Sequence, residues 1–187
     1  MIKSAHEVNT TLQFDSAIKE CRDIFFKKTI DYGTSWRVYR TISVADQIYI
    51  KARRIRNIQE QGSQKVSDDI KSEFSGILNY GLIGLIQIEL AGNEKEDMPV
   101  KEVMKMYDEK VLSSKNLMLD KNHDYGEAWR EMSEESFADL ILAKILRIRQ
   151  ILQNKGQTLV SEGIDANFYD IINYAVFALI LHQSKNH

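Results

Sequence analysis

Residues 28–37 read KTIDYGTSWR, and residues 121–130 repeat the phrase as KNHDYGEAWR, 93 positions further along the chain. Both phrases carry a lysine, the triplet Asp-Tyr-Gly, a tryptophan and an arginine at matching places. The match continues, at the same spacing and then at 94 positions, through pairs that include Asp46 and Asp139, Lys51 and Lys144, Arg54 and Arg147, Phe74 and Phe168, and Asn79 and Asn173. A repeat this long indicates a tandem duplication, in which each unit leaves an apolar face that its sister covers.

The composition favours helices. Of the 187 residues 43% are hydrophobic, and only one proline and nine glycines interrupt segments rich in Ile, Leu, Lys, Glu and Ala. A chain of this length buries one good core, whereas two separate cores of half the length would be marginal. We therefore expect an all-α fold, a six-helix pseudo-two-fold bundle built from two tandem three-helix repeats. Residues 13–91 would form the first unit and residues 99–183 the second, packed together as one compact domain.

Apolar periodicity places the six expected helices at residues 13–30, 43–60, 67–90, 99–122, 136–154 and 161–183. The clearest linker lies between the units, where Gly92 stops one helix and Pro99 suits the first turn of the next. The third helix of each unit has the strongest apolar pattern, so these two helices should form the shared core. The first helices should close the bundle. Residues 1–12 lie outside the repeat and are either loosely attached or an early start of the first helix.

Charge and cysteine content limit the classes of function. The formal charge is −2, so binding of duplex DNA or RNA has no bulk electrostatic support. The single cysteine, Cys21, cannot form an internal disulfide, and no secretory signal is visible at the amino terminus. The most apolar window, residues 77–90, is shorter than the roughly 20 residues of a membrane helix and contains polar side chains. We expect a cytoplasmic protein with no membrane partner.

The repeated phrase has the composition of a ligand site. Its lysine and arginine are suited to phosphate, and its tyrosine or tryptophan can face a nucleobase. The candidate nucleotide contacts in the two phrases are Lys28, Asp31, Tyr32, Trp36 and Arg37, and Lys121, Asp124, Tyr125, Trp129 and Arg130. The alternative interpretation is structural: the aromatic rings plug the end of the bundle, the aspartate turns the chain and the glycine takes positive φ.

The second helix of each unit carries a basic stripe. Its members are Lys51 and Arg54 in the first unit and Lys144 and Arg147 in the second. These side chains either contact phosphate or form a solvated helix face. Asp139 is a candidate metal ligand on the same helix, but both Asp46 and Asp139 follow a serine by three residues, which is the spacing of a capping box.

The last helix carries Glu162, Asp170 and Asn173 on one stripe, because they are eight and eleven residues apart. Carboxylate and amide oxygens so placed suit Mg²⁺ that carries a polyphosphate. Glu162 and Asp170, with Asp139, are therefore the candidate metal ligands. Asn173 and its counterpart Asn79 are candidate nucleotide contacts.

The two units differ on this stripe. Gly76 stands in the first unit where the second unit has Asp170, so one carboxylate is missing there. Apolar neighbours of Asp170 indicate a mostly buried surface, where a carboxylate needs a partner. Lys144 or Arg147 is able to serve as that partner without any metal. We expect the second unit to be the better site.

Three spaced motifs resemble the nucleotide-modification-associated family in its two-copy form. They are Lys-x-x-Asp-Tyr-Gly, the Asp-x-x-x-x-Lys-x-x-Arg of the second helix and the Glu/Asp…Asn-Tyr of the third, and the match covers almost all of residues 13–183. The resemblance implies a role associated with nucleotide modification. More remotely, the helical pattern is similar to MazG-like nucleoside triphosphate pyrophosphohydrolases, which use helix-borne carboxylates and Mg²⁺. Their Glu-Glu-x-x-Glu motif is absent, because Glu134 and Glu135 lack the third acid.

The leading hypothesis is a nucleotide-binding protein, with Mg²⁺-dependent hydrolysis of a nucleoside di- or triphosphate as a candidate activity. The sequence has no nucleophile arrangement and no glycine-rich phosphate loop, so the catalytic residues are unassigned. A homodimer is left open. The alternative is a non-catalytic helical scaffold or partner-binding protein.

Overall fold

The computed structural model describes residues 5–62 and 69–185, and the side chains of residues 9–62 and 69–184. Within these residues the chain forms six α-helices and two short 3₁₀ helices, with no strand. They are α1 (Ala5–Tyr32), η1 (Ser35–Val38), α2 (Thr41–Gln61), α3 (Ile70–Glu89), α4 (Val100–Tyr125), η2 (Ala128–Glu131), α5 (Glu134–Gln153) and α6 (Ile164–Lys185). The predicted all-α fold of two tandem three-helix units is confirmed. Helix α1 begins at Ala5, so residues 5–12 are an early start of the first helix, and residues 1–4 lie outside the described residues.

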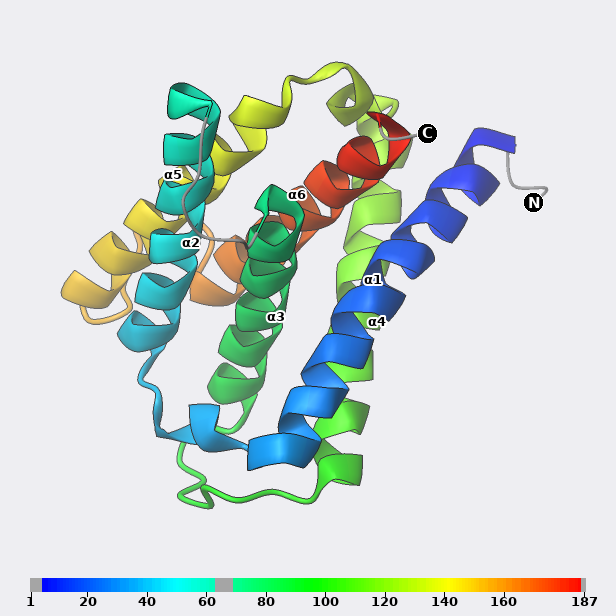
Figure 1. The fold of residues 1–187 in the computed structure, drawn as a ribbon. Helices are drawn as coiled ribbons and strands as arrows, with labels where there is room; N and C mark the ends of the chain where they lie inside the picture. The colour runs from blue at the N-terminus through cyan, green and yellow to red at the C-terminus, as the bar shows by residue number, and fades with distance from the viewer. Residues whose placement is uncertain (1–4, 63–68, 186–187) are drawn as a thin grey trace.

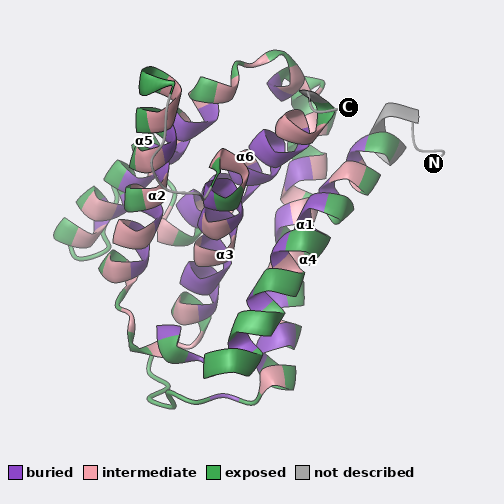
Figure 2. Ribbon diagram, viewed as in Figure 1, coloured by how far each residue is buried: buried purple, intermediate pink, exposed green. Residues whose placement is uncertain are grey.

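The helices lie in three layers, each made of one helix from either unit (Figure 1). Helices α3 and α6 form the middle layer and pack on each other, as the apolar pattern of the third helices predicts. Helices α2 and α5 cover one side of this pair, and α1 and α4 cover the other. Buried residues therefore run along most of α3 and α6, while the outer faces of the other four helices are exposed (Figure 2).

Two glycines let the central helices approach closely. A Cβ atom at Gly81 would lie 2.7 Å from the Ile172 side chain, and one at Gly84 would lie 2.7 Å from the Phe168 ring. Such distances are too short for carbon atoms, so these positions accept no larger residue without a shift of α3 against α6. The two glycines thus set the spacing of the middle layer.

The repeated phrase spans a helix end in each unit. Helices α1 and α4 continue through Asp-Tyr, and Gly33 and Gly126 then take positive φ, at 65° and 61°. Each glycine N–H donates to the carbonyl oxygen four residues earlier, which closes the last turn of the helix. The tryptophan follows in a 3₁₀ helix and is buried in both units. The glycines thus take the positive φ that the structural interpretation predicts.

Asp46 and Asp139 do not cap their helices. Helices α2 and α5 begin at Thr41 and Glu134, and neither has a side-chain hydrogen bond at its N-cap. Instead, Asp46 accepts a hydrogen bond from Arg149 at 2.7 Å. In the same way Asp139 lies 3.5 Å from Arg56, which is the repeat counterpart of Arg149. The capping-box prediction was wrong because the helices start two residues earlier, which places Ser43 and Ser136 inside the first turn and Asp46 and Asp139 beyond it. These reciprocal ion pairs join α2 to α5.

Helix α6 is long and apolar enough, over residues Ile164–Ser184, to cross a membrane by length and composition alone. In this fold, however, 67% of that window is buried inside the protein. It packs on α3 and α5, as a core helix does. We therefore interpret α6 as part of the core.

A pair of asparagines ties the middle layer to the outer helices. Asn79 on α3 donates to the carbonyl oxygen of Cys21 on α1 at 3.0 Å, and Asn173 on α6 donates to that of Ser114 on α4 at 3.2 Å. The two bonds are related by the repeat. Only Asn79 has a partner for its side-chain oxygen, the Tyr107 hydroxyl at 2.8 Å, whereas Asn173 Oδ1 is buried without a hydrogen bond. Both asparagines therefore have a structural role.

Replacing Tyr107 by phenylalanine is expected to lower the free energy of unfolding by about 1 kcal/mol, because Asn79 Oδ1 would lose its donor. Chemical denaturation of the purified chain measures this change. The sister position provides the control: Phe14→Tyr adds a hydroxyl on the side of the bundle where Asn173 Oδ1 has no partner. It should leave the stability unchanged or higher. A larger loss for Phe14→Tyr than for Tyr107→Phe would show that packing, not hydrogen bonding, governs these positions.

Candidate functional site

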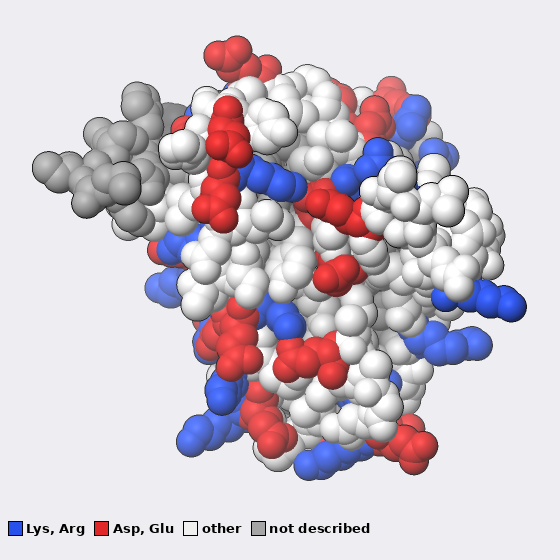
Figure 3. Space-filling view, turned by 180° about the vertical axis from the view of Figure 1, so that it is seen from behind, with Lys and Arg blue, Asp and Glu red and all other residues white. Residues whose placement is uncertain are grey.

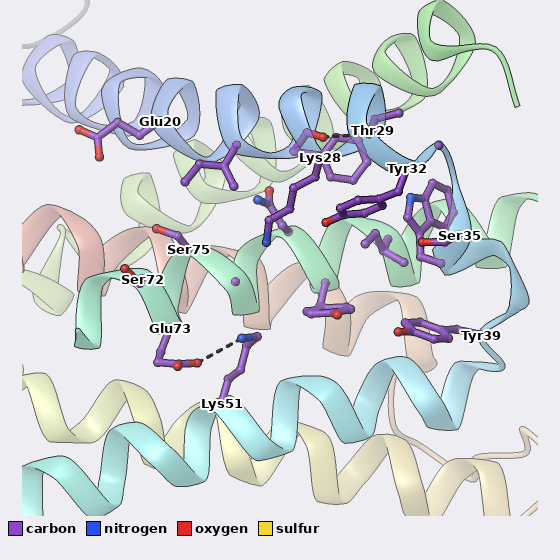
Figure 4. Close-up of a pocket in the computed structure, with 18 of the residues that line it drawn as sticks. Glu20, Lys28, Thr29, Tyr32, Ser35, Tyr39, Lys51, Ser72, Glu73 and Ser75 are labelled. Atoms are coloured by element: carbon purple, nitrogen blue, oxygen red, sulfur yellow. Dashed lines mark hydrogen bonds and ion pairs between the residues drawn. The ribbon is translucent and has the colours of Figure 1, made fainter. Parts of the chain in front are cut away.

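A cavity of about 610 Å³ opens in the first unit between α1, α2 and α3 (Figure 4). Its size falls within the range of roughly 300–1,000 Å³ that is common for small-molecule sites. Polar and aromatic side chains from all three helices and from η1 line it. The lining residues include Lys28, Tyr32, Trp36, Tyr39, Lys51, Glu73, Gly76, Asn79 and Tyr80.

Two lysines enter the cavity from opposite helices. Lys28 descends from the last turns of α1 and Lys51 rises from the middle of α2, with both amino groups directed into the space between the helices (Figure 4). Gly76 on α3 lines the cavity beside Lys51, since a Cβ atom there would lie 2.9 Å from Lys51 Cε. No ion pair or hydrogen bond is found for the Lys28 side chain within the part of the chain that the structure describes. The cavity therefore contains a cation without a counter-charge.

Glu73 is the buried acid of the cavity wall. Its carboxylate lies 3.2 Å from Lys51 Nζ and also accepts from Arg54. The side chain is 6% exposed, so the two cations compensate the cost of burying its charge. Lys51 shares this carboxylate with Arg54, so part of its charge is left for a ligand.

Aromatic rings form the other end of the cavity. Tyr32 is exposed at the mouth, and Tyr39 and Tyr80 stack on each other with ring centroids 6.4 Å apart. Burial, together with the neighbouring Tyr39, raises the pKa of Tyr80 to about 12, so this hydroxyl stays protonated at neutral pH. Flat faces and hydroxyl groups of this kind suit a heterocyclic ring that stacks and forms hydrogen bonds.

Trp36 carries an unsatisfied donor. Its ring is 7% exposed and lines the cavity, yet the indole Nε1 is buried without a hydrogen-bond partner. In the second unit the equivalent Trp129 donates to Asn122 Oδ1 at 3.2 Å. The first unit has Thr29 in place of Asn122, and the threonine hydroxyl donates to the Phe25 carbonyl oxygen. A buried N–H without an acceptor is uncommon, so this donor distinguishes the first unit from the second.

In the second unit the equivalent of the cavity lysines is neutralised from within. Lys121 Nζ and Lys144 Nζ lie 2.6 Å from the two oxygens of Asp170, one on each. Burial alone would raise the pKa of Asp170, but hydrogen bonds from the two lysines outweigh burial and hold that pKa below its ordinary value. Asp170 therefore stays ionised, and its charge belongs to an ion triad.

The arginines of the repeated phrase are used in the fold. Arg37 donates to the carbonyl oxygens of Asn93 and Lys95, which fastens the linker between α3 and α4. Arg130 donates to Glu127 and to side chains of α1, and its guanidinium lies 4.3 Å from the centre of the Trp129 ring. Neither arginine lines the cavity of the first unit. Both therefore have a structural role.

Four further candidates of the phrase and basic stripe lie outside the cavity. Tyr125 is 75% exposed, and Asp31, Asp124 and Arg147 are exposed as well. Trp129 is buried and stacks on Phe177 with centroids 4.2 Å apart. Of the second unit's candidates, Lys121, Lys144 and Asp170 thus meet in one ion triad, whereas Tyr125 and Arg147 are exposed to solvent.

The candidate metal ligands do not come together. Asp139 faces Arg56 on the outer layer, Asp170 is held by two lysines, and Glu162 is exposed before the start of α6. Within residues 5–62 and 69–185, no group of three acidic, histidine or cysteine side chains is arranged to hold a metal ion. The three-carboxylate site that the spacing predicted is therefore not formed by these residues alone.

Sequence reasoning missed several residues of the cavity. Glu73, Tyr39 and Tyr80 were not among the candidates, and of these only Tyr80 recurs in the second unit, where Asn167 and Met132 replace the other two. The difference between Gly76 and Asp170 was the signal that could have located the cavity. A glycine opposite two lysines indicates an open site more directly than a carboxylate between them.

Fold and site together define an all-α protein of two tandem units with a polar, aromatic-walled cavity in the first. The family model for nucleotide modification associated domain 1 matches the chain twice, at residues 28–88 and 121–181. The chain therefore belongs to the nucleotide modification associated domain 1 family. Both matches begin at the lysine of the repeated phrase. No curated protein and no solved structure matches the chain, and no relation to MazG-like pyrophosphohydrolases is found.

Proposed function

We propose that the first unit binds a nucleoside phosphate in the cavity between α1, α2 and α3. The phosphate would lie between Lys28 and Lys51, and the base would lie against Tyr32, Trp36 and the tyrosine pair. The observation that carries the proposal is the convergence of two lysines and an aromatic wall on one cavity. At the equivalent position the second unit places a carboxylate between the two equivalent lysines, Lys121 and Lys144. Membership of a family associated with nucleotide modification supports this class of ligand.

The charge of the cavity favours an anion. Lys28, Lys51 and Lys71 line it, with Glu20 and Glu73 as the acids. Lys71 and Glu20 pair with each other at 2.6 Å, and Arg54 adds a further cation on Glu73. The surplus is therefore positive and is placed near Lys28 and Lys51. A phosphate held by two ammonium groups forms charge-assisted hydrogen bonds, which are stronger than neutral ones.

The aromatic wall favours a base over a simple anion. Stacking of a base on an aromatic side chain contributes about 1–3 kcal/mol in nucleic-acid complexes. Trp36 Nε1 is a buried donor that needs an acceptor, and nucleobases carry ring nitrogens and carbonyl oxygens that accept. A ligand with both a phosphate and a base would use both ends of the cavity.

On the face of the protein drawn in Figure 3, acidic and basic side chains are interspersed, so this face shows no extended basic surface. Binding of a small nucleotide, rather than of duplex nucleic acid, thus stays our proposal. We retain Mg²⁺ as an ion that a di- or triphosphate would bring with it, since Mg²⁺ commonly binds substrate phosphates with few protein ligands. Hydrolysis, as in MazG-like enzymes, is a second candidate activity.

Replacing Lys28 by methionine should weaken nucleotide binding by about tenfold or more, which corresponds to the loss of one charge-assisted contact. Isothermal titration with nucleoside mono-, di- and triphosphates, each with and without Mg²⁺, measures the affinity, and a phosphate-release assay on the same samples tests hydrolysis. Lys121→Met is the matched control, because Lys121 binds Asp170 and lies in the other unit. It should leave the affinity unchanged.

The result that would overturn the proposal is equally clear. If no nucleotide binds to the unsubstituted chain under any of these conditions, the alternative of a non-catalytic helical scaffold is favoured. Equal losses for Lys28→Met and Lys121→Met would also count against a site in the first unit alone. Sedimentation of the same samples would test whether a homodimer forms.

A further inference from the structure

The ion triad of the second unit, formed by Lys121, Lys144 and Asp170, lies at the position that corresponds to the cavity of the first unit. We infer that Asp170 fills a second anion site with its own carboxylate, and that this site takes inorganic phosphate once the carboxylate is removed. The inference rests on the proposed function, because it assumes that the equivalent lysines in the first unit bind phosphate.

The repeat places three residues in register. Lys28 corresponds to Lys121, Lys51 to Lys144 and Gly76 to Asp170. In the second unit both lysines reach the Asp170 oxygens at 2.6 Å. Two ammonium groups are thus held around one anionic group with bidentate geometry. A phosphate presents oxygens with the same charge and the same ability to accept, so it can replace the carboxylate between the lysines.

The site is enclosed on one side and reachable on the other. The Asp170 and Lys144 side chains are 9% and 13% exposed, while that of Lys121 is 48% exposed. A small anion can therefore enter past Lys121 and would then face Lys144 in a partly desolvated position. Desolvation strengthens the attraction between unlike charges. Without any anion the two lysines would repel each other, so removal of the Asp170 carboxylate favours the binding of another anion.

The second unit does not offer the base-binding half of the cavity. Trp129 is stacked on Phe177, and its N–H is already bonded to Asn122. Met132 stands where the first unit has Tyr39. The ligand of this second site is therefore a phosphate group alone, and inorganic phosphate is the appropriate probe.

The experiment uses the full chain with Asp170→Ala, in a Lys28→Met background that removes the first site. Alanine keeps the Cβ atom and suits a helix, so it leaves space for the anion at little cost to α6. Thermal unfolding is followed at rising phosphate concentration against chloride at equal ionic strength, and phosphate binding is titrated calorimetrically. We expect phosphate to raise the melting temperature and to bind at about one site per chain, by mass action. Asp170→Asn in the same background is the control, because its amide still fills the position.

Each outcome decides the inference. Phosphate-specific stabilisation of Asp170→Ala, or folding of this variant only when phosphate is present, supports a self-filled anion site. A folded Asp170→Ala that does not respond to phosphate overturns it, and so does a variant that fails to fold at every phosphate concentration. Failure of the proposed function is seen separately, as absence of nucleotide binding to the unsubstituted chain.

Discussion

Gly76→Asp is expected to reduce nucleotide binding at least about a hundredfold, which is a loss of roughly 3 kcal/mol of binding free energy. The new carboxylate would stand between Lys28 and Lys51, as Asp170 stands between Lys121 and Lys144. It would neutralise the lysines and repel the phosphate of the ligand. Isothermal titration with the best-binding nucleotide of the wild-type chain measures the effect.

The fold should tolerate this change. Glycine in a helix interior costs about 1 kcal/mol relative to alanine, so replacing Gly76 removes a weak point of α3. The Cβ atom would lie 2.9 Å from Lys51 Cε, but this contact is with a flexible side chain that can move away. Thermal unfolding should therefore show a melting temperature equal to or above that of the wild-type chain.

Gly76→Ala separates crowding from charge. Alanine adds the same Cβ atom without the carboxylate, so it should retain most of the nucleotide affinity. If alanine abolishes binding as strongly as aspartate, the space above Gly76 matters and the charge does not. If neither variant binds more weakly than the wild-type chain, the ligand does not lie between the two lysines.

Asp170→Asn is expected to lower the free energy of unfolding at neutral pH by about 2–4 kcal/mol. Removing one partner of a buried ion pair typically costs about 3–5 kcal/mol, because the remaining charge is left uncompensated. The Lys121 side chain is 48% exposed, so solvent screens part of the loss. Chemical denaturation at neutral pH measures the difference.

The difference should shrink in acid. The pKa of Asp170 in the folded protein lies below its ordinary value of 3.8: burial raises it, and the hydrogen bonds from Lys121 and Lys144 lower it more. The unfolded state therefore takes up a proton first as the pH falls. The stabilisation by the carboxylate is nearly complete above about pH 5 and is lost as the pH falls through the unfolded pKa and then the lower folded pKa. Wild type and Asp170→Asn should converge there.

Asp139→Asn is the matched control for this second prediction. Like Asp170, Asp139 is paired with a cation, in this case Arg56 of the other unit at 3.5 Å, but the Asp139 side chain is 60% exposed. Exposed pairs contribute little, so its stability should differ from wild type by less than about 1 kcal/mol at all pH values. An Asp170→Asn chain as stable as Asp139→Asn at neutral pH would contradict the role of the ion triad.

Much of the fold was predictable because its signals are local or repeated. The phrase around Asp-Tyr-Gly ends a helix in each unit through a glycine of positive φ, and the apolar stripes of α3 and α6 identify the central layer. The starts of α2 and α5 were placed two residues late. Helix α2 begins after Arg40 with no acidic residue in its first turn, so no residue type marks its start. Helix α5 does carry start signals, Ser133 at the N-cap and Glu134 and Glu135 in the first turn, but the predicted start at residue 136 did not use them.

The site was less predictable because its members come from three helices. Lys28, Tyr32, Trp36 and Lys51 were among the candidates and line the cavity. Arg37 and Arg130 are of the residue type expected for phosphate contacts, yet Arg37 fastens the linker and Arg130 binds the amino-terminal helix. A guanidinium donates to a carbonyl oxygen as readily as to a phosphate, and the residue type alone does not distinguish the two.

The sequence by itself determined the duplication, the helical class and the positions at which the two units carry different residues, because periodicity and repetition are properties of the order of residues in the chain. Only the tertiary structure decided which unit is open. The distance between Lys121 and Asp170, 49 positions apart, depends on how α4 and α6 pack. The packing thus gives both lysines of the second unit one shared carboxylate, whereas in the described part of the first unit Lys51 pairs with Glu73 and Lys28 has no ion pair. Charges interact through space, and the packing of the helices sets the distances between them.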